Sequence, residues 1–400
     1  MTSGTATTPS GVRTSQSGLL LAGILLIAAN LRAAITSVGP VVEDIRGDLD
    51  IGGATASVLI SLPLVAFAVI SPLAPALARR IGVERALGAA LVLLATATVV
   101  RSLPSAVALW TGTAFLGIAV AVINVVLPSL VKREYPGRIG QVTGLYSSVQ
   151  GAAAALASGL AVPLAGTTQH GWRLALGIWA GLGLVALAVF LPQLRRRSIP
   201  PAPGSPLAGG AHRSPWTSAL GWQVTVFMGS QSTIYFTLIT WWPSVERAHG
   251  VSAAAAGWHL FAMQVAGLLA NLATARLIPR RPDQRLLILG ATALFVIAIV
   301  GQLTLPEASL LWIVIAGAAG GACIVLALSL FGLRTHDHHQ AAALSGMAQS
   351  VGYAMAAGGP VLLGALHDST GSWTAPLLVL LAVLVVQAAT GLPAGRARLL

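Results

Sequence analysis

An arginine stands inside an apolar run that is long enough to cross a membrane. The stretch ANLRAAITSVGP, residues 29–40, places Arg32 about fourteen residues into a span of roughly 25. A guanidinium near the middle of a bilayer costs about 2.5 to 3.5 kcal/mol on insertion scales, so it needs a partner or a wet cavity. Its planar fork of N–H donors suits a carboxylate-like or other electron-rich group. Arg32 therefore predicts a buried cationic site for an anionic or strongly polar solute.

Other polar residues occur in pairs four apart, which places both members of a pair on one helical face. Thr36 shares a face with Arg32, whereas Asn124 stands alone in an apolar segment. The predicted substrate-binding set is Arg32, Thr36, Asn124, Tyr146, Gln150, Gln231, Tyr235, Gln349 and Tyr353. The alternative for any one of them is a hydrogen bond between helices, worth about 0.6 kcal/mol in a membrane bundle. His259 and Gln264 are weaker candidates.

The acidic residues argue against two kinds of transport chemistry. None of the eleven Asp and Glu residues is expected at the depth of Arg32, and Glu246 is expected on or near the outer side. A transporter of apolar cations would want a buried carboxylate, and so would the usual carboxylate proton relay. We therefore expect neither, while a coupling proton or a counter-ion stays open as a partner.

No residue pattern for catalysis stands out. No G-x-x-x-x-G-K-[ST] loop occurs, so ATP is not the expected energy source. A nucleophile with its base is not seen at depth, so we expect no enzyme and no cofactor. THDHHQ, residues 335–340, could suggest a metal site, but its place beside Arg334 on a short loop favours a solvated turn, and no metal is predicted. A lone cysteine, Cys323, forms no disulfide within the chain.

The elements that must carry these residues are transmembrane helices. Hydrophobic residues make up 56% of the chain and charged residues 8%, whereas an ordinary soluble chain has about 25% charged residues. Apolar blocks near 20 residues match a hydrocarbon layer about 30 Å thick, and they lack the alternation of barrel strands. Twelve spans are predicted, at residues 18–42, 54–78, 84–103, 106–131, 140–165, 172–193, 217–242, 253–277, 284–305, 309–333, 340–366 and 373–392.

The basic residues indicate the orientation in the membrane. One set of alternate loops, together with both chain ends, holds 18 Lys and Arg residues, and the other set holds 4. Because basic residues stay on the cytoplasmic side, we expect a multi-pass protein of the cytoplasmic membrane with both termini in the cytoplasm. The net charge of +12 then reflects topology and contact with anionic lipid, and nucleic acid is not an expected partner.

The regions outside the spans are short. Residues 1–17 are rich in Ser, Thr and Gly and predict a disordered tail. A cleaved signal peptide is the alternative for the first span, although the apolar stretch is too long for one and continues past Arg32. Residues 194–216 predict a linker between bundles at 18–193 and 217–392, and residues 393–400 predict a second tail.

The two halves of the chain repeat each other. PVVEDIRG from Pro40 matches PSVERAHG from Pro243 at an offset of 203 residues, and TGLYSSV from Thr143 matches SGMAQSV from Ser345 at an offset of 202. Each half has six predicted spans, so both repeats enter the membrane with the same polarity. This is the parallel arrangement of a transporter with its site between two bundles near the midplane. The offset of 203 also places Tyr235 at the position that matches Arg32.

Four stretches resemble the cyanate permease and nitroimidazole transporter branch of the major facilitator superfamily. They are NLRAAITSVGP from Asn30, NVVLPSLVKREYP from Asn124, TGLYS from Thr143 and GSQSTIYFTLITWWP from Gly229. The resemblance covers about residues 18–392 and implies twelve transmembrane helices in two six-helix bundles. In LARRIGVER, Arg79 stands where the superfamily usually has an acidic residue, so the charge relay attributed to that loop is expected to differ.

These observations favour a secondary transporter that moves a small polar, anionic solute by alternating access. The solute would be cyanate-like or a small organic molecule, and the protein would act as a monomer in the lipid bilayer. The alternative is an exporter of small neutral aromatic compounds of the nitroimidazole type. A structural role for Arg32, reaching backbone carbonyls or Glu43 by snorkelling, is the alternative to a solute site.

Overall fold

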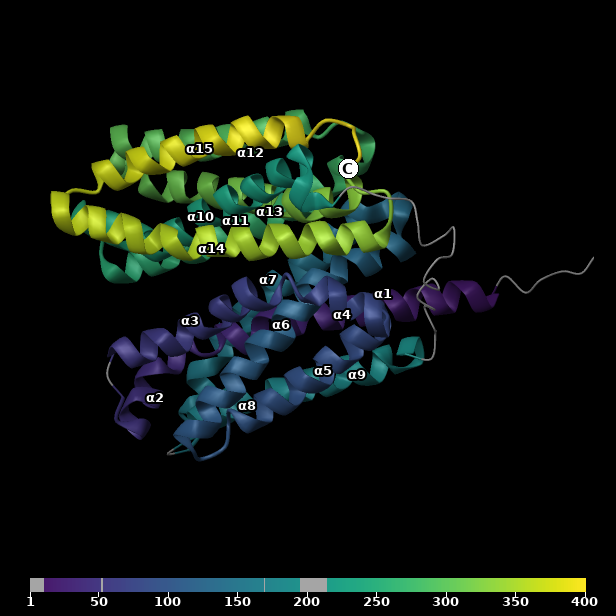
Figure 1. Ribbon diagram of the computed structural model, residues 1–400. Helices are drawn as coiled ribbons and strands as arrows, with labels where there is room; N and C mark the ends of the chain where they lie inside the picture. Colours follow the sequence, from purple (N-terminus) through teal and green to yellow (C-terminus); the bar gives the residue numbers. More distant parts are fainter. Residues whose placement is uncertain (1–10, 52, 169, 195–213) are drawn as a thin grey trace, which may run out of the picture.

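The computed structural model describes residues 11–51, 53–168, 170–194 and 214–400. These residues form helices joined by short turns, with no strand among them, which confirms the all-α prediction. Figure 1 shows the helices in two layers, with α1 to α9 in one and α10 to α15 in the other. The linker expected at 194–216 falls mainly on residues outside the described ranges.

Among the residues that the structure describes, the N-terminal half contains nine helices in chain order. α1 and α2 are followed by α3 and α4, which together cover the second predicted span, and α8 and α9 together cover the sixth. Their bounds are α1 Gly11–Thr36, α2 Val42–Leu49, α3 Gly53–Ile70, α4 Ala74–Ile81, α5 Val83–Val100, α6 Ala106–Glu134, α7 Ile139–Ala165, α8 Gly171–Gly177 and α9 Trp179–Leu194.

The C-terminal half contains six long helices. Short 3-10 turns precede or connect several of them, among them Pro215–Thr217 and Pro306–Ala308. The bounds are α10 Ala219–Ala248, α11 Ala253–Leu277, α12 Arg285–Thr304, α13 Ser309–Leu333, α14 His338–Thr370 and α15 Thr374–Ala394.

Helices therefore occupy each of the twelve predicted spans. Among the described residues, nine helical segments are both long and apolar enough to cross a membrane, and α3, α10 and α14 are not in that set. At 30 and 33 residues, α10 and α14 have the length, but they carry many polar side chains. These two polar helices pack against each other in the C-terminal half. Polar side chains in a membrane bundle are expected to face other helices or a wet cavity rather than lipid.

The tail expected at residues 1–17 overlaps the start of α1. α1 begins at Gly11, so residues 11–17 continue the first membrane helix, while residues 1–10 lie outside the described ranges. Extending a helix that is already nucleated adds one hydrogen bond per residue, so polar residues can follow an apolar helix at low cost. The tail expected at 393–400 is tied down at its start, because Arg334 donates to the carbonyls of Ala394 and Gly395 at 2.9 and 2.8 Å.

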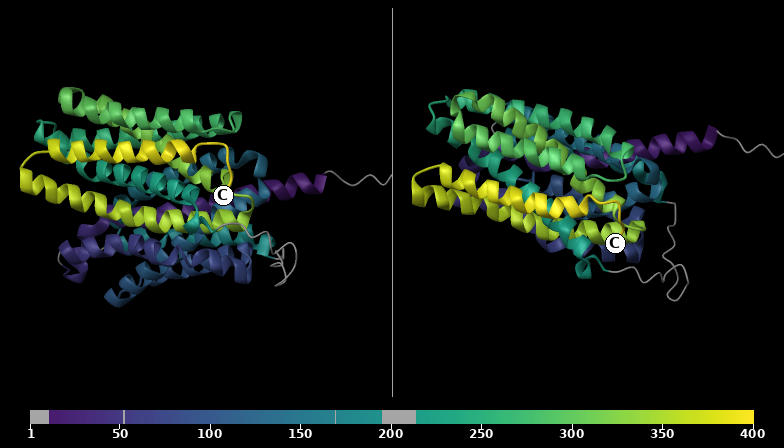
Figure 2. Two further views of the ribbon diagram at one scale, coloured as in Figure 1. Left: turned by 45° about the horizontal axis from the view of Figure 1, so that its top comes forward. Right: turned by 90° about the horizontal axis from the view of Figure 1, so that it is seen from above.

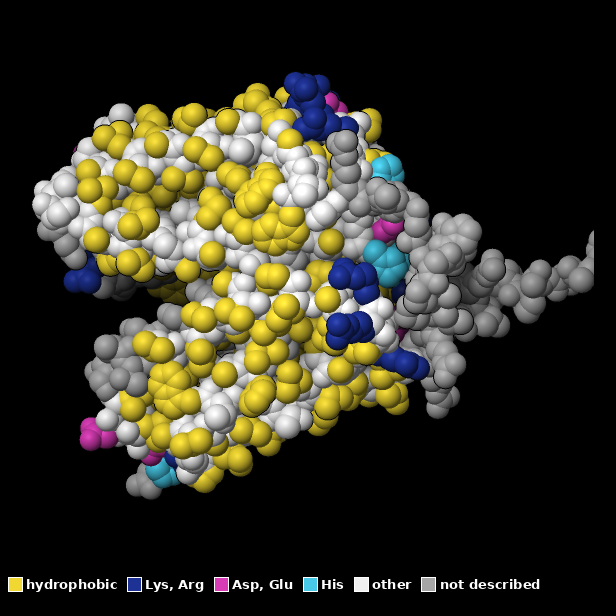
Figure 3. Space-filling view, viewed as in Figure 1, with side chains coloured by type: hydrophobic (Ala, Val, Ile, Leu, Met, Phe, Trp, Pro, Cys, Tyr) yellow, Lys and Arg dark blue, Asp and Glu magenta, His cyan; other side chains and the backbone are white. Residues whose placement is uncertain are grey.

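One end of the molecule gathers basic side chains, and we call it the basic end. It includes Arg79, Arg138, Arg280 and Arg285, all of them exposed or nearly so. Figures 1 and 2 show that the C-terminus and the N-terminal end of α1 also lie there. Figure 3 shows apolar side chains over the long flanks of the molecule and a cleft between the two halves that opens at the other end, which we call the open end.

Close packing joins the halves at the basic end. Gly144 on α7 lies so near α11 that a Cβ in its place would overlap the methyl of Ala275. Beside it, Ser148 Oγ lies 3.4 Å from Asn271 Oδ1. Lys132 Nζ at the end of α6 donates to the carbonyls of Gly332 and Thr335, at 2.8 and 3.0 Å. The cleft is therefore closed toward the basic end.

Candidate functional site

Arg32 lies on α1 with a half-buried side chain. Within the described residues, no hydrogen bond or ion pair holds its guanidinium. Its charge acts on the hydroxyls of Tyr235 on α10 and Tyr353 on α14, which belong to the other half. The tyrosine that the repeat matches to Arg32 is thus one of the two that lie within its electrostatic reach. The guanidinium is thus within electrostatic range of two phenols of the other half.

Aromatic side chains from both halves surround this place. The ring centroids of Phe67 on α3 and Tyr353 are 4.9 Å apart, and those of Phe236 and Tyr353 are 6.5 Å apart. Tyr235 and Phe236 meet edge to face at 5.7 Å. We call Phe67, Tyr235, Phe236 and Tyr353 the aromatic wall. It provides flat apolar surfaces next to a cation, which suits a flat solute with one electron-rich end.

The Tyr235 side chain is fixed from two sides. Its hydroxyl donates to Gln264 Oε1 on α11 at 2.7 Å. Its ring lies against Gly320 on α13, where an added Cβ would come within 3.0 Å of the ring. A phenol that is oriented in advance loses little conformational freedom when a solute binds. Gln264, a weak candidate from sequence, is therefore part of the site's support.

Several predicted residues are engaged in packing. The Thr36 hydroxyl donates to the carbonyls of Arg32 and Ala154, at 3.0 and 3.2 Å, and so ties α1 to α7. Gln231 is 2% exposed and its amide donates to Ser232 Oγ at 2.7 Å on its own helix. This bonding engages the amide N–H groups of Gln231 on its own helix, and the expectation that its amide faces the cavity gains no support from this geometry.

The remaining predicted residues lie near the closed base of the cleft. Tyr146 on α7 is 2% exposed, and its hydroxyl lies within electrostatic range of Tyr353. Gln150 is half-buried one turn further along α7. Gln349 on α14 donates to the backbone carbonyl of Asn124 on α6 at 2.9 Å and to Ser345 Oγ at 2.9 Å. Gln349 and Asn124 thus meet in a contact between the halves.

Two prolines explain why backbone carbonyls are free to make that contact. A proline has no N–H, so the carbonyl four residues earlier loses its helical partner. Pro128 frees the carbonyl of Asn124, which accepts from Gln349. Pro72, at the break between α3 and α4, frees the carbonyl of Ala68, which accepts from Ser350 Oγ at 2.7 Å. We call these two bonds the proline-gated contacts.

A buried carboxylate is present, contrary to the expectation from sequence. Glu246 near the end of α10 is 0% exposed, and its Oε1 lies 2.7 Å from both His259 Nδ1 and Ser309 Oγ. Its place in the polar segment VERAHG indicates an exposed helix end, but α11 and α13 pack over it. The argument that no buried acid exists is therefore wrong. His259, a weak candidate, is the partner of this acid.

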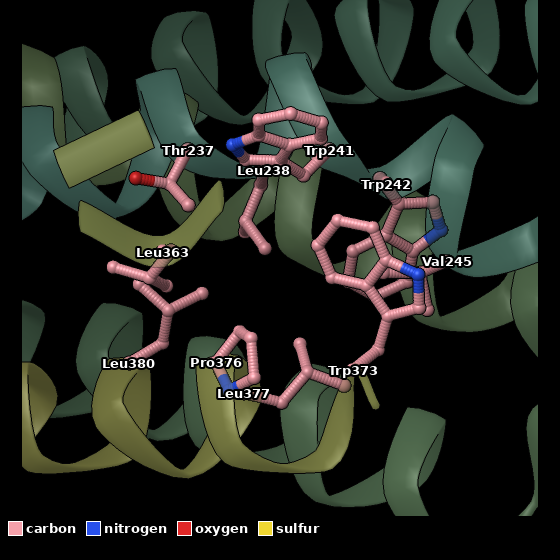
Figure 4. A pocket seen from close by; sticks show the side chains of 10 residues that line it. All are labelled: Thr237, Leu238, Trp241, Trp242, Val245, Leu363, Trp373, Pro376, Leu377 and Leu380. Atoms are coloured by element: carbon pink, nitrogen blue, oxygen red, sulfur yellow. The ribbon is translucent and has the colours of Figure 1, made fainter. Parts of the chain in front are cut away.

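A small apolar pocket lies elsewhere, inside the C-terminal half. Figure 4 shows its lining from α10, α14 and α15, which includes Trp241, Trp242, Trp373 and Leu380. Thr237 contributes a hydroxyl to an otherwise apolar and aromatic lining. The pocket contains none of the predicted site residues, so we place the candidate site in the cleft between the halves.

THDHHQ forms the start of α14 at the basic end. The Asp337 carboxylate accepts from the backbone N–H of Gln340 at 2.8 Å, which is the geometry of a helix N-cap. The rings of His338 and His339 lie 4.1 Å apart. Burial, with the charges of His339 and Arg133, lowers the pKa of His338 to about 4. His338 is therefore neutral at physiological pH.

Known proteins resemble this chain along nearly all of its length. The sequence profile of the Major Facilitator Superfamily matches residues 24–357. The chain is 44% identical over 385 residues to the uncharacterized transporter YycB of Bacillus subtilis (strain 168), covering 96% of this chain and 95% of the relative. It is 41% identical over 378 residues to the 2-nitroimidazole transporter of Escherichia coli (strain K12), covering 94% and 95%.

A more distant relative and a solved structure agree with these matches. The cyanate transport protein CynX of Escherichia coli (strain K12) is 27% identical over 372 residues, covering 88% of this chain and 91% of the relative. The structure of the proton:xylose symporter XylE superimposes with a TM-score of 0.76 at 12% identity, covering 97% of this chain and 98% of that one. At that identity the likeness to XylE concerns the fold alone.

Proposed function

The chain belongs to the major facilitator superfamily of transporters, and from this premise we propose that it moves a small, flat solute with an anionic or electron-rich end across the cytoplasmic membrane. Transport would be secondary active and would follow alternating access between the two halves. The relatives in the cyanate and nitroimidazole branch support the class of solute, because cyanate is a compact anion and 2-nitroimidazole is a compact ring with electron-rich nitro oxygens. No catalytic step is part of the proposal.

The observation that carries the proposal is that, in the described part of the chain, the guanidinium of Arg32 has no hydrogen-bond or ion-pair partner. An arginine in a membrane bundle normally has a partner, because an unpaired buried cation is costly. Among the described residues Arg32 has the two tyrosine hydroxyls in reach and no carboxylate. A solute that supplies an electron-rich group would offset this cost, and the planar fork can hold two of its oxygens at once.

The aromatic wall favours the second candidate as well, the export of neutral aromatic compounds. Phe67 and Tyr353 come from different halves and lie 4.9 Å apart by centroid, so a flat ring could stack on either of them. A solute with a nitro group would fit both candidate functions, because the group presents paired electron-rich oxygens on an uncharged ring. We therefore infer that the polar group of the solute points to Arg32 and its ring to the aromatic wall.

The distribution of basic residues supports an assignment of the side of the membrane that the cleft faces. If the basic end is cytoplasmic, as the positive-inside rule indicates, both termini lie in the cytoplasm and the open end faces outward. The solute would then reach Arg32 from outside. To release it inward, the transporter must break the Lys132 contacts and the two proline-gated contacts at the basic end. The contacts that must break to open the inner closure are therefore hydrogen bonds to backbone carbonyls.

Uptake into proteoliposomes tests the proposed function. Labelled 2-nitroimidazole and labelled cyanate serve as probes, and the proteins are wild type, Arg32→Gln and the control Arg247→Gln, which removes an exposed arginine at the open end. We expect uptake of at least one probe by wild type and the control, and uptake by Arg32→Gln reduced about tenfold or more, as the loss of one charge-assisted contact implies. Uptake no greater than in empty vesicles for both probes would refute the proposed class of solute.

A further inference from the structure

The buried carboxyl of Glu246 has an uneven set of partners. Its Oε1 lies 2.7 Å from His259 Nδ1, accepts from Ser309 Oγ at 2.7 Å and accepts from Trp242 Nε1 at 3.3 Å. Its Oε2 is equally buried and has no hydrogen-bond partner within the described part of the chain. Three groups thus converge on one oxygen, and the other oxygen is left in an apolar environment.

This arrangement fits a carboxyl that carries a proton in the conformation described. An ionised carboxylate shares its charge between both oxygens, and a buried charged oxygen without a donor costs several kcal/mol. A proton removes the net charge and leaves a neutral group that still accepts three contacts at Oε1. The geometry therefore distinguishes Glu246 from Asp48 at the same end, whose carboxylate meets Arg173 at 2.7 Å and Trp172 at 3.1 Å.

His259 gives the buried acid a route to solvent. Its side chain is 19% exposed, whereas that of Glu246 is 0% exposed. Imidazole gains and loses a proton near neutral pH, so it can pass one between water and an adjacent carboxyl. Other titratable or charged side chains near this end include Arg247, His249, Glu307 and His367 of the C-terminal half, and Asp48, His170 and Arg173 of the N-terminal half. Arg247, His249 and Glu307 are exposed, and His367 stacks on Trp373.

The same pair of helices carries the proposed solute site. α10 and α11 are joined at the open end by Glu246 and His259, and deeper by Tyr235 and Gln264. The two links are eleven residues apart on α10, or about 16 Å at 1.5 Å per residue. If a proton at the first link shifts α10 against α11, it also moves the Tyr235 phenol at the second link. By linkage, a solute bound at the second link changes proton affinity at the first.

We propose that Glu246 and His259 form the binding site for the proton that drives or is exchanged for the solute. This inference rests on the proposed function as a secondary transporter. In one transport cycle the carboxyl O–H of Glu246 forms when the imidazolium of His259 gives up its proton. The O–H bond breaks again when Glu246 gives the proton back to His259, which releases it to water after the transporter has changed its conformation.

Glu246→Gln is a matched substitution for the test. The amide keeps an oxygen that can accept from Ser309, Trp242 and a His259 N–H, and it places an NH₂ where Oε2 stands, but it cannot titrate. Glu307→Gln is the control, because Glu307 is an exposed acid at the same end, two residues from Ser309. Wild type and both variants are reconstituted, and labelled 2-nitroimidazole is the probe in two assays, equilibrium exchange and accumulation driven by a pH gradient.

A gradient of one pH unit has the same free energy as a tenfold ratio of solute concentrations. It can therefore drive about tenfold accumulation if one proton moves with each solute. We expect wild type and Glu307→Gln to exchange and to accumulate the probe. Glu246→Gln should exchange it at a similar rate and lose the accumulation. Accumulation by Glu246→Gln equal to that of wild type, or wild-type exchange that no pH gradient can turn into accumulation, would overturn the proton site and leave the solute site standing.

A readout without solute keeps the two proposals separable if wild type fails to exchange the probe, or if Glu246→Gln fails to fold in vesicles. Infrared spectroscopy of purified wild type follows the carbonyl stretch of protonated carboxyls during a pH titration. We expect one such band that is absent in Glu246→Gln, kept in Glu307→Gln and shifted in His259→Gln. Identical bands in wild type and Glu246→Gln would overturn the inference whatever the solute is.

Discussion

Two arginines in this protein lie among membrane helices and have opposite surroundings. Arg101, just after α5, is 1% exposed, and its guanidinium donates to the carbonyls of Ala34 at 2.7 Å and Leu176 at 3.3 Å. Arg32 on α1 is half-buried beside a cleft, with two phenols in electrostatic reach and no bonded partner among the described residues. The same residue type thus joins three helices at one position and is available to a ligand at the other.

The two arginines therefore differ in the partners that hold them, and the proposed solute role falls to the one that is not held. A guanidinium whose two terminal nitrogens donate to backbone carbonyls, as in Arg101, adds to the stability of the bundle and offers little to a solute. A guanidinium without partners adds nothing to stability and keeps its binding capacity. From the sequence, Arg101 falls at the outer end of the span predicted at residues 84–103 and Arg32 inside the first span, and neither position indicates which guanidinium is bonded to backbone carbonyls.

The largest effect that we expect on stability comes from Arg101→Met. This change keeps the length of the side chain and removes both hydrogen bonds to the carbonyls of Ala34 and Leu176, so the free energy of unfolding should fall by roughly 3 kcal/mol. Arg32→Met should leave the thermal midpoint unchanged or raise it, because it removes an unpaired charge. Thermal unfolding of the purified variants measures both effects. An equal fall in stability for Arg101→Met and Arg32→Met would contradict the proposed difference between the two arginines.

A smaller effect is expected from the phenols that face Arg32. Tyr235→Phe removes the hydroxyl that donates to Gln264, and Tyr353→Phe removes the other hydroxyl in reach of Arg32. One hydrogen bond is worth about 0.5 to 1.5 kcal/mol, so the affinity for 2-nitroimidazole should fall about two- to tenfold in each variant. Binding titrations of folded protein measure this. Affinities that match wild type in both variants would assign the tyrosines to packing.

The smallest effect concerns the closure beneath the site. Pro128→Ala restores an N–H that can bond to the carbonyl of Asn124, so this carbonyl becomes a weaker acceptor for the Gln349 amide. The Pro128→Ala variant should therefore populate, more than wild type does, the conformation in which the basic end opens and the open end closes. Spin labels at Arg138→Cys and Arg280→Cys, exposed residues on either side of the closure, should give a longer mean distance. An unchanged distance distribution would remove the proline-gated contacts from the gating mechanism.

Much of the fold could be predicted from the sequence because membrane helices are set by length and polarity. The offset of 203 residues also placed Tyr235 opposite Arg32, since a parallel repeat brings equivalent helices to the same depth. The aromatic partners Phe67 and Phe236 were missed, because apolar aromatic residues in an apolar span carry no signal of their own. Phe236 stands next to Tyr235, which is the clue that the sequence did offer.

Other features depend on how helices pack, which one sequence does not specify. Glu246 is near a helix end and looks exposed until α11 and α13 cover it. Gln349 and Asn124 share the polarity of a binding site, but Pro128 turns the Asn124 carbonyl into an acceptor for the opposite half. Thr36 and Gln231 satisfy their own hydrogen bonds at close range. Their expected place in the substrate site therefore stays a prediction.

The central claim is that Arg32 binds the electron-rich end of the solute. It is tested most directly by the thermal stabilisation that 2-nitroimidazole and cyanate give to purified wild type, Arg32→Lys and Arg32→Gln, with Arg247→Gln as the control. Lys keeps the charge without the planar fork and Gln keeps neither. The account predicts full stabilisation of wild type and the control, less for Arg32→Lys and least for Arg32→Gln. Equal stabilisation of all four proteins would contradict it.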